Sequence, residues 1–173
     1  CDKWKLNPGC LNCPLRRNHF SSIYWKKMNN LINDYGNFSV VTVSEYVKNE
    51  YLKSPYIKDK IIQVVNDCVS SSFEYRVLNE KLLGIDEKKK NILFVVPDTK
   101  NVNKGFDYLE MISKKMLQYN FICIAYNNNT YIKNENLILL PAISNELVLS
   151  NYYSKADLTL ILSKSETFCL PVA

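Results

Sequence analysis

Short apolar runs alternate with amphipathic stretches along the second half of the chain. Strand-sized apolar runs occupy residues 92–96, 121–126, 137–140 and 158–162. Between them, residues 105–119 and 145–155 have the spacing of helices, and the first of these repeats apolar residues every three to four positions. Because the predicted strands are continuous apolar runs, we expect them to be buried on both faces of a parallel sheet. The predicted fold class is α/β, with a Rossmann-like parallel sheet flanked by helices.

The first half of the chain contains shorter elements of the same kinds. The predicted strands are residues 38–43 and 61–65, and a helix is predicted at residues 21–34. Ser44 is a favourable N-cap for a further helix that contains Val47 and Tyr51. Ser71, with Glu74 three residues later, forms a capping-box pattern, which predicts a short helix ending near Gly84.

The composition is that of a folded chain rather than a disordered one. A chain of 173 residues with 47% hydrophobic residues can bury a core, and it suits one domain or one domain with part of a second. The net charge of +5 comes mainly from lysine, which lacks the planar fork that reads bases, so we expect no nucleic-acid partner. No apolar run approaches the roughly 20 residues that cross a bilayer.

The six cysteines divide into a cluster at the start of the chain and three scattered residues. This distribution argues against a disulfide framework spread over the chain and favours a reducing cytoplasm. Cys1, Cys10 and Cys13 have in part the spacing of a zinc site, but they lack an obvious fourth ligand. We therefore expect ordinary reduced thiols and no metal, with zinc at these three residues as the alternative.

Several common catalytic motifs are absent from the sequence. With four glycines, the chain has neither a dinucleotide-binding loop nor a P-loop, and His19 as the single histidine gives no Ser-His-Asp arrangement. Ligands of open parallel sheets bind at the carboxyl ends of the strands, so the loops after the predicted strands are the candidate site.

Two charged residues in those loops suit an anionic ligand that also carries hydroxyl groups. Lys104 precedes a predicted helix, whose N-terminal N–H groups favour phosphate. Glu166 lies before a second predicted helix start, which Pro171 places near Cys169 and Leu170. Together they suit a nucleotide sugar. The alternative is that Lys104 is an ordinary solvated lysine and that Glu166 belongs to a capping box.

The segments NILFVVPDTKNVNKGFDYL and ADLTLILSKSETFCLPVA resemble the donor-binding half of GT-B fold glycosyltransferases of the retaining family 4 (group 1) type. Residues 38–86 are similar to the segment that links the acceptor domain to the donor domain, and residues 1–14 resemble a cysteine-containing insert of a subgroup that acts on surface polysaccharides. The resemblance implies the C-terminal part of an acceptor domain and the linker in residues 1–75. It implies a nucleotide-sugar-binding domain, incomplete at its C-terminus, in residues 76–173.

The resemblance also implies roles for individual residues. Lys104 would bind the diphosphate and Glu166 the hydroxyls of the donor sugar, and both would be catalytic. Further donor-binding residues would be Pro141 near the base, followed by Thr167, Phe168, Cys169 and Leu170. The chain departs from the family pattern at four points. It has Pro97 and Asp98 where an arginine is usual and Cys169 where glycine is usual, residues 66–68 lack the usual proline and glycine of the interdomain segment, and the chain ends one residue before a usual second carboxylate.

The implied activity is transfer of a hexosyl-type sugar from a nucleoside-diphosphate sugar, with retention and without a cofactor, to a glycan or lipid-linked acceptor. The expected setting is surface polysaccharide biosynthesis in the cytoplasm, with peripheral association of the full-length protein at the inner face of the membrane. The isolated chain is expected to be inactive. The alternatives are a degenerate, non-catalytic nucleotide-sugar-binding or interaction protein and, from the cysteine cluster, a metal-stabilised nucleic-acid module.

Overall fold

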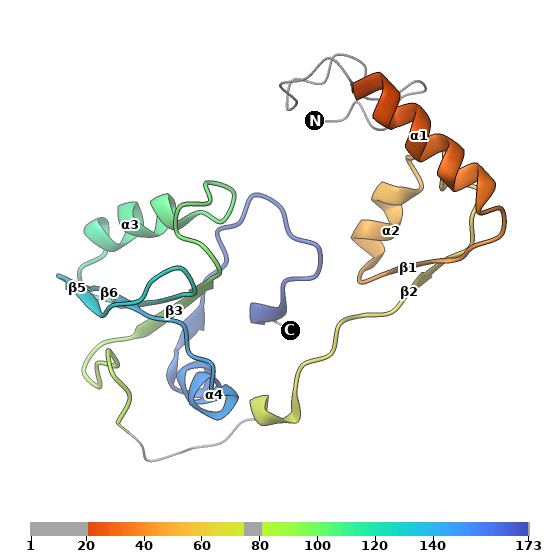
Figure 1. Ribbon diagram of the computed structural model, residues 1–173. Helices are drawn as coiled ribbons and strands as arrows, with labels where there is room; N and C mark the ends of the chain where they lie inside the picture. The colour runs from red at the N-terminus through yellow and green to blue at the C-terminus, as the bar shows by residue number, and fades with distance from the viewer. Residues whose placement is uncertain (1–20, 75–80, 173) are drawn as a thin grey trace. The chain divides into compact units, whose positions relative to one another are not determined.

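The computed structural model describes residues 21–74 and 81–172, and the chain forms two compact units (Figure 1). Unit 1 is Cys1–Asp67 and unit 2 is Cys68–Ala173. The division lies within the segment that the sequence analysis interprets as an interdomain linker. The assignment of the units to an acceptor and a donor domain stays a prediction.

Unit 1 is a small α/β arrangement. Its elements in chain order are α1 (Ser21–Asp34), β1 (Val40–Thr42), α2 (Glu45–Tyr51) and β2 (Ile62–Val64). The two strands are parallel, with Val40 opposite Ile62. Ser44 caps α2, because its hydroxyl accepts a hydrogen bond from the N–H of Val47 at 3.2 Å. All four elements were predicted, and each strand is shorter than its apolar run because only three residues pair.

Unit 2 is an α/β layer structure built on a five-stranded, mostly parallel sheet. Its strands are β3 (Asn91–Val96), β4 (Asn120–Ala125), β5 (Ile132–Asn134), β6 (Leu137–Leu140) and β7 (Leu158–Thr159). Its helices are the 3₁₀ turn η2 (Ser71–Phe73), α3 (Phe106–Lys115), α4 (Glu146–Lys155) and the 3₁₀ turn η3 (Leu170–Val172). The strand order is β5-β6-β4-β3-β7, and only β5 is antiparallel. The α/β prediction is confirmed at this level.

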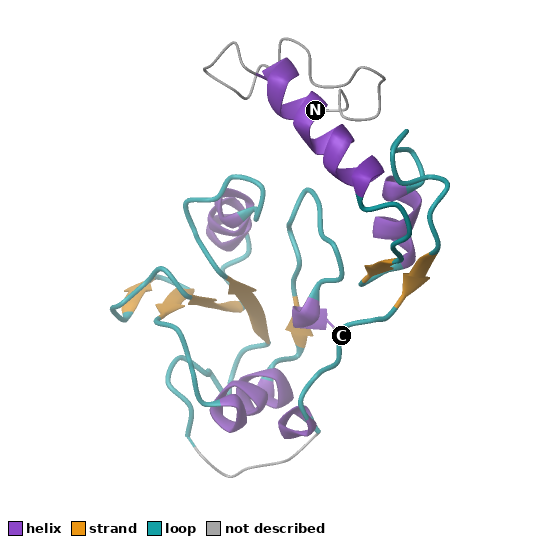
Figure 2. Ribbon diagram, turned by 45° about the vertical axis from the view of Figure 1, so that its right-hand side comes forward, coloured by secondary structure: helices purple, strands orange, loops and turns teal. Residues whose placement is uncertain are grey.

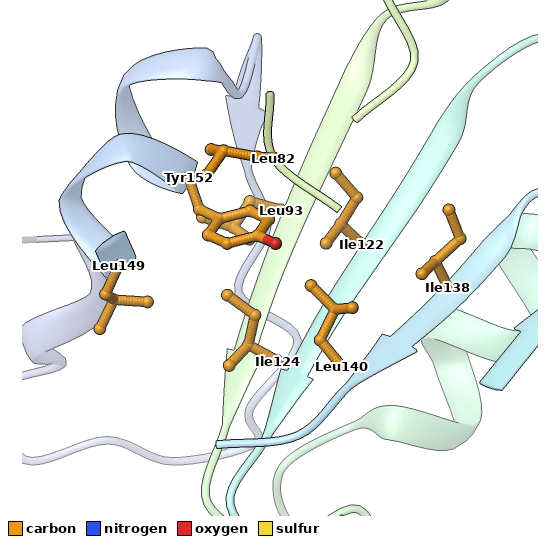
Figure 3. Close-up of a cluster of buried hydrophobic side chains, with 8 residues drawn as sticks. All are labelled: Leu82, Leu93, Ile122, Ile124, Ile138, Leu140, Leu149 and Tyr152. Atoms are coloured by element: carbon orange, nitrogen blue, oxygen red, sulfur yellow. The ribbon is translucent and has the colours of Figure 1, made fainter. Parts of the chain in front are cut away.

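The sheet is covered on both faces, with α3 on one side and α4 on the other (Figure 2). Against Leu109 of α3 lie buried side chains from alternate strand positions, including Phe94 and Phe121. On the α4 side lies the cluster in Figure 3, in which Leu149 and Tyr152 of α4 pack with Leu82, Leu93, Ile122, Ile124, Ile138 and Leu140. All residues of β4 are buried, as expected of a central parallel strand that is covered on both faces.

The connections create a topological switch point between β3 and β7. From β3 the chain proceeds through α3 to β4 and then to β6, away from β7 in the sheet. From β6 it returns through α4 on the other face and forms β7 on the opposite side of β3. Ligands of open α/β sheets bind outside the carboxyl ends of the strands at such a point. The loops after β3 and β7 therefore border the expected binding crevice.

Four predictions about the elements need correction. The helix predicted from the Ser71–Glu74 pattern to near Gly84 is wrong at both ends, because η2 is capped by Ser70, Glu74 is already extended, and residues 81–85 are not helical; residues 75–80 lie outside the described residues. The helix predicted over 105–119 ends at Lys115, where Met116 leaves the helical region with φ −122° and ψ 61°. Strand β5 was missed, and the last predicted strand pairs over only two of its five residues.

Candidate functional site

The loops after β3 and β7 meet at the switch point. The N–H of Lys164 donates to the carbonyl oxygen of Asn103 at 2.9 Å. Gly105, the N-cap of α3, has a left-handed φ of 76°. A Cβ atom at this position would lie 2.3 Å from the carbonyl oxygen of Leu162. Glycine therefore permits both the turn into α3 and the close approach of the second loop.

The structure brings Lys104 and Glu166 together across these two loops. Lys104 Nζ donates to Glu166 Oε1 at 2.9 Å and to Oε2 at 3.0 Å. The two side chains are 25% and 27% exposed, so the pair is partly buried yet reachable from solvent. Two residues separated by 62 positions in the sequence thus form an ion pair at the carboxyl ends of β3 and β7. Their roles in binding stay a prediction.

The environment of Glu166 favours its ionised form. Burial raises its pKa, but hydrogen bonds from Lys104 and Ser163 and the positive charge of Lys104 outweigh this effect, so the pKa lies below its ordinary value. The carboxylate is therefore charged at neutral pH. It can exchange its bonds with Lys104 for bonds from other donors, including hydroxyl groups.

The lowered pKa predicts a pH-dependent contribution of Glu166 to stability. Since the folded-state pKa is depressed, this contribution is present above the unfolded-state pKa of about 4.3 and is lost as the pH falls through the folded-state value. We expect the wild-type chain to be more stable than Glu166→Gln at about pH 7, and the difference to disappear in acid. Denaturant unfolding of both proteins across this range measures it. A difference that grows in acid would contradict the assignment.

The loop between β3 and α3 is held by side-chain hydrogen bonds. Asp98 Oδ1 accepts from the N–H of Lys100 at 2.8 Å and from Asn127 Nδ2 at 2.7 Å. Asn127 Oδ1 in turn accepts from the N–H of Thr99 at 3.1 Å. Asp98, which stands where the resemblance led us to expect an arginine, therefore organises the loop that carries Lys104. Lys100 is exposed in the same loop.

The segment after Glu166 reaches the second predicted helix start. Thr167 is exposed, Phe168 and Cys169 are partly buried, and Leu170 begins η3. Cys169 has φ 70°, a left-handed backbone conformation that residues other than glycine rarely adopt. The resemblance led us to expect glycine at this position, and the backbone does adopt the conformation that favours glycine.

Cys169 lies within electrostatic range of both charged residues of the pair. Burial raises the pKa of its thiol, Glu166 raises it further, and Lys104 lowers it, with a net increase. The thiol is therefore protonated at neutral pH.

An apolar cleft of about 910 Å³ opens on the α4 side of the switch point. Its wall includes three aromatic side chains, Phe73, Tyr126 and Tyr153, and Phe73 and Tyr153 form an edge-to-face pair with ring centroids 5.9 Å apart. Two carboxylates, Glu74 and Glu146, also line it, and none of its described lining residues is lysine or arginine. The cleft suits an uncharged, planar group rather than a phosphate.

Tyr153 connects the cleft with the charged loops. Burial raises the pKa of its hydroxyl to about 12, and the neighbouring Tyr126 and Cys169 contribute in the same direction. The hydroxyl is therefore protonated at neutral pH. Glu166 and Lys104 also shift the pKa of Cys169. The cleft and the ion pair are therefore neighbouring parts of one region.

The predicted site residues are divided between these parts. Lys104 and Glu166 form the ion pair, and Leu170 lines the cleft. Pro141 follows β6, is partly buried and does not line the cleft. Glu146 and Tyr153 of the cleft were not predicted, although Glu146, Leu149 and Tyr153 have the three- and four-residue spacing of one helix face, a signal that could have revealed them.

The described residues contain no group of three histidine, cysteine or carboxylate side chains that could hold a metal ion. The cysteine cluster of Cys1, Cys10 and Cys13 lies outside the described residues, so zinc binding there stays a hypothesis. None of the described helices combines the length and apolar character needed to cross a bilayer. A comparison with protein-family models, curated proteins and solved structures finds no match to this chain.

Proposed function

We propose that unit 2 binds a nucleoside-diphosphate sugar as the donor-binding part of a GT-B type glycosyltransferase. The observation that carries the proposal is the ion pair of Lys104 and Glu166 at the switch point of a parallel sheet. A lysine suits the diphosphate, and a carboxylate beside it suits the sugar hydroxyls. The aromatic cleft next to the pair supplies space for the nucleoside.

In this function, the nucleotide sugar separates Lys104 from Glu166, and each side chain exchanges its hydrogen bonds with the other for hydrogen bonds with the ligand. Lys104 and the N–H groups of the first turn of α3 bind the diphosphate oxygens. Glu166 then accepts hydrogen bonds from hydroxyls of the sugar. The backbone amides near Cys169 and Leu170 add donors to the phosphate or sugar oxygens.

The full-length enzyme transfers the sugar with retention at the anomeric carbon. As the bond between this carbon and the diphosphate oxygen breaks, negative charge grows on the leaving diphosphate. Lys104 and the helix N-terminus stabilise that charge, so they bind the transition state more strongly than the ground state. The acceptor, a glycan or lipid-linked sugar, provides the hydroxyl oxygen that forms the new bond to the anomeric carbon, and the proton of this hydroxyl passes to an oxygen of the departing diphosphate.

The cleft accommodates the base and ribose of the donor. Its aromatic and aliphatic side chains pack against a base, and the absence of cations among its described lining residues directs the phosphates to Lys104. Glu146, in the first turn of α4, offers a carboxylate to donor groups of the ribose or base.

Alanine substitution of either charged residue tests the proposal. We expect Lys104→Ala and Glu166→Ala each to weaken donor binding by about tenfold to a hundredfold, as for a lost charge-assisted hydrogen bond. Calorimetric titration with UDP-glucose and GDP-mannose measures the affinity. Matched controls are Lys114→Ala and Glu110→Ala, both at exposed positions of α3, which should leave the affinity unchanged. Unchanged affinity in both site variants, or no binding by the wild type, would refute the proposal.

Cys169 favours a second candidate function, a non-catalytic nucleotide-sugar-binding protein. Its side chain occupies a left-handed backbone position where glycine would let a ligand approach the amide groups most closely. Donor binding by the full-length protein without sugar transfer or donor hydrolysis would support this function. Measurable transfer would exclude it.

A further inference from the structure

A basic surface lies at the amino ends of the strands, opposite the ends that carry the ion pair. Two adjoining hollows of about 490 Å³ and 380 Å³ open there, between the loop before β3, the start of β7 and the C-terminal end of α4. Six lysines line them: Lys81, Lys88, Lys89, Lys90, Lys133 and Lys155. We call these six residues the basic face.

The acidic groups within the basic face are few and mostly engaged. Among the described residues that line the hollows, only Asp86, Glu87 and Asp157 are acidic. Asp157 accepts from Lys90 Nζ at 2.6 Å and from the N–H of Asn91 at 2.8 Å. Asp86 accepts from the N–H of Lys88 at 2.8 Å. Six lysines against three carboxylates among the described lining residues give the two hollows a positive potential.

Exposed apolar side chains accompany the lysines. Tyr131 lines the larger hollow and is 45% exposed. Leu117 is 53% exposed, and its carbonyl oxygen accepts from Lys89 Nζ at 3.0 Å. Cationic and apolar side chains thus share one surface.

We propose that the basic face docks unit 2 on the surface of a bilayer that contains anionic phospholipids. Lysine acts as a point charge that suits a diffuse layer of headgroups, and none of the described residues that line the hollows is an arginine that could bind one phosphate in a bidentate manner. The exposed apolar side chains can enter the region between headgroups and acyl chains, which a soluble polyanion does not offer. This proposal is independent of the proposed function, because the donor loops lie at the other ends of the strands.

Vesicle sedimentation with the full chain tests the docking surface. We expect the wild type to bind vesicles of phosphatidylcholine with about one-third phosphatidylglycerol and not vesicles of phosphatidylcholine alone. The double variant Lys88→Gln/Lys133→Gln should lower the partition coefficient by about tenfold or more. The matched control, Lys114→Gln/Lys115→Gln, removes the same charge from exposed positions on α3 and should change it by less than about twofold.

The remaining outcomes would overturn the proposal. Absence of wild-type binding to the anionic vesicles is one, and equal losses in the two double variants are another, because they would show a response to net charge alone. Binding that neither variant changes would indicate another surface of the chain. Release of the protein from vesicles by glycerol 1-phosphate would indicate a soluble phosphate ligand instead of a bilayer.

Discussion

Replacing Gly105 with alanine should destabilise unit 2 by about 3 kcal/mol, because it combines a left-handed backbone with a direct clash. The residue has φ 76°, and an added Cβ would lie 2.3 Å from the carbonyl oxygen and 2.7 Å from the Cβ of Leu162. The nearest obstacle is backbone, so no rotamer change relieves it. The loop after β7 must move away, and we expect donor binding to be lost as well.

Hydrogen exchange is a suitable measurement of this effect. Both tryptophans, Trp4 and Trp25, lie in unit 1, so tryptophan fluorescence does not report directly on unit 2. Exchange of the amides of β3 and β4, followed by mass spectrometry on peptides, reports on the unfolding of unit 2 itself.

Gly84→Ala is the matched control for Gly105→Ala. Gly84 has φ 86°, and the nearest contact of its added Cβ is the Ile138 side chain at 3.1 Å, which can shift more easily than backbone. We expect this control to cost about 1 to 2 kcal/mol. Equal effects of the two substitutions would show that the close approach of the loop at Gly105 is absent.

Asn136→Ala should destabilise unit 2 by about 2 to 3 kcal/mol, because it leaves buried carbonyl groups without donors. The Asn136 side chain is buried, and its Nδ2 donates to the carbonyl oxygens of Ser113, Met116 and Tyr119 at 3.1, 3.1 and 2.9 Å. These carbonyls lie at the end of α3 and in the turn into β4. The same exchange measurement on the β3 and β4 amides gives the effect.

Two further variants make the test of Asn136 specific. Asn136→Asp keeps the size but replaces the donors with acceptors, so it should be at least as destabilising at neutral pH. Its folded-state pKa would be raised, so its stability should recover as the pH falls. Asn129→Ala, at an exposed loop position, should change stability by less than about 0.5 kcal/mol. If Asn136→Ala behaves like Asn129→Ala, the carbonyls have other donors.

The parts of the fold that were predictable are those in which local sequence and burial agree. Strands β3, β4 and β6 are apolar runs in the core, and α4 begins directly after Asn145, whose side chain accepts from the N–H groups of Leu147 and Val148. Strand β5 has three exposed residues and depends on pairing with β6, which no local pattern reveals. The end of α3 depends on Asn136, 20 or more residues further along the chain.

The candidate site was likewise predictable only in part. Lys104 and Glu166 were placed in loops that follow parallel strands, and the topology of the sheet brings such loops together. The cleft was not predicted, because Phe73 reaches it only through packing of η2 against α4. Contacts of this kind depend on the tertiary structure and leave no periodic pattern in the sequence.

The contact between Gly105 and Leu162, together with the hydrogen bond from Lys164 to Asn103, fixes the two loops against each other before any ligand arrives. Their conformational entropy is therefore lost during folding rather than on association. A ligand that fits this preorganised frame retains more of its interaction energy as affinity. Conversely, a ligand that needs the loops further apart must break the glycine contact, so the frame discriminates by spacing as well as by charge.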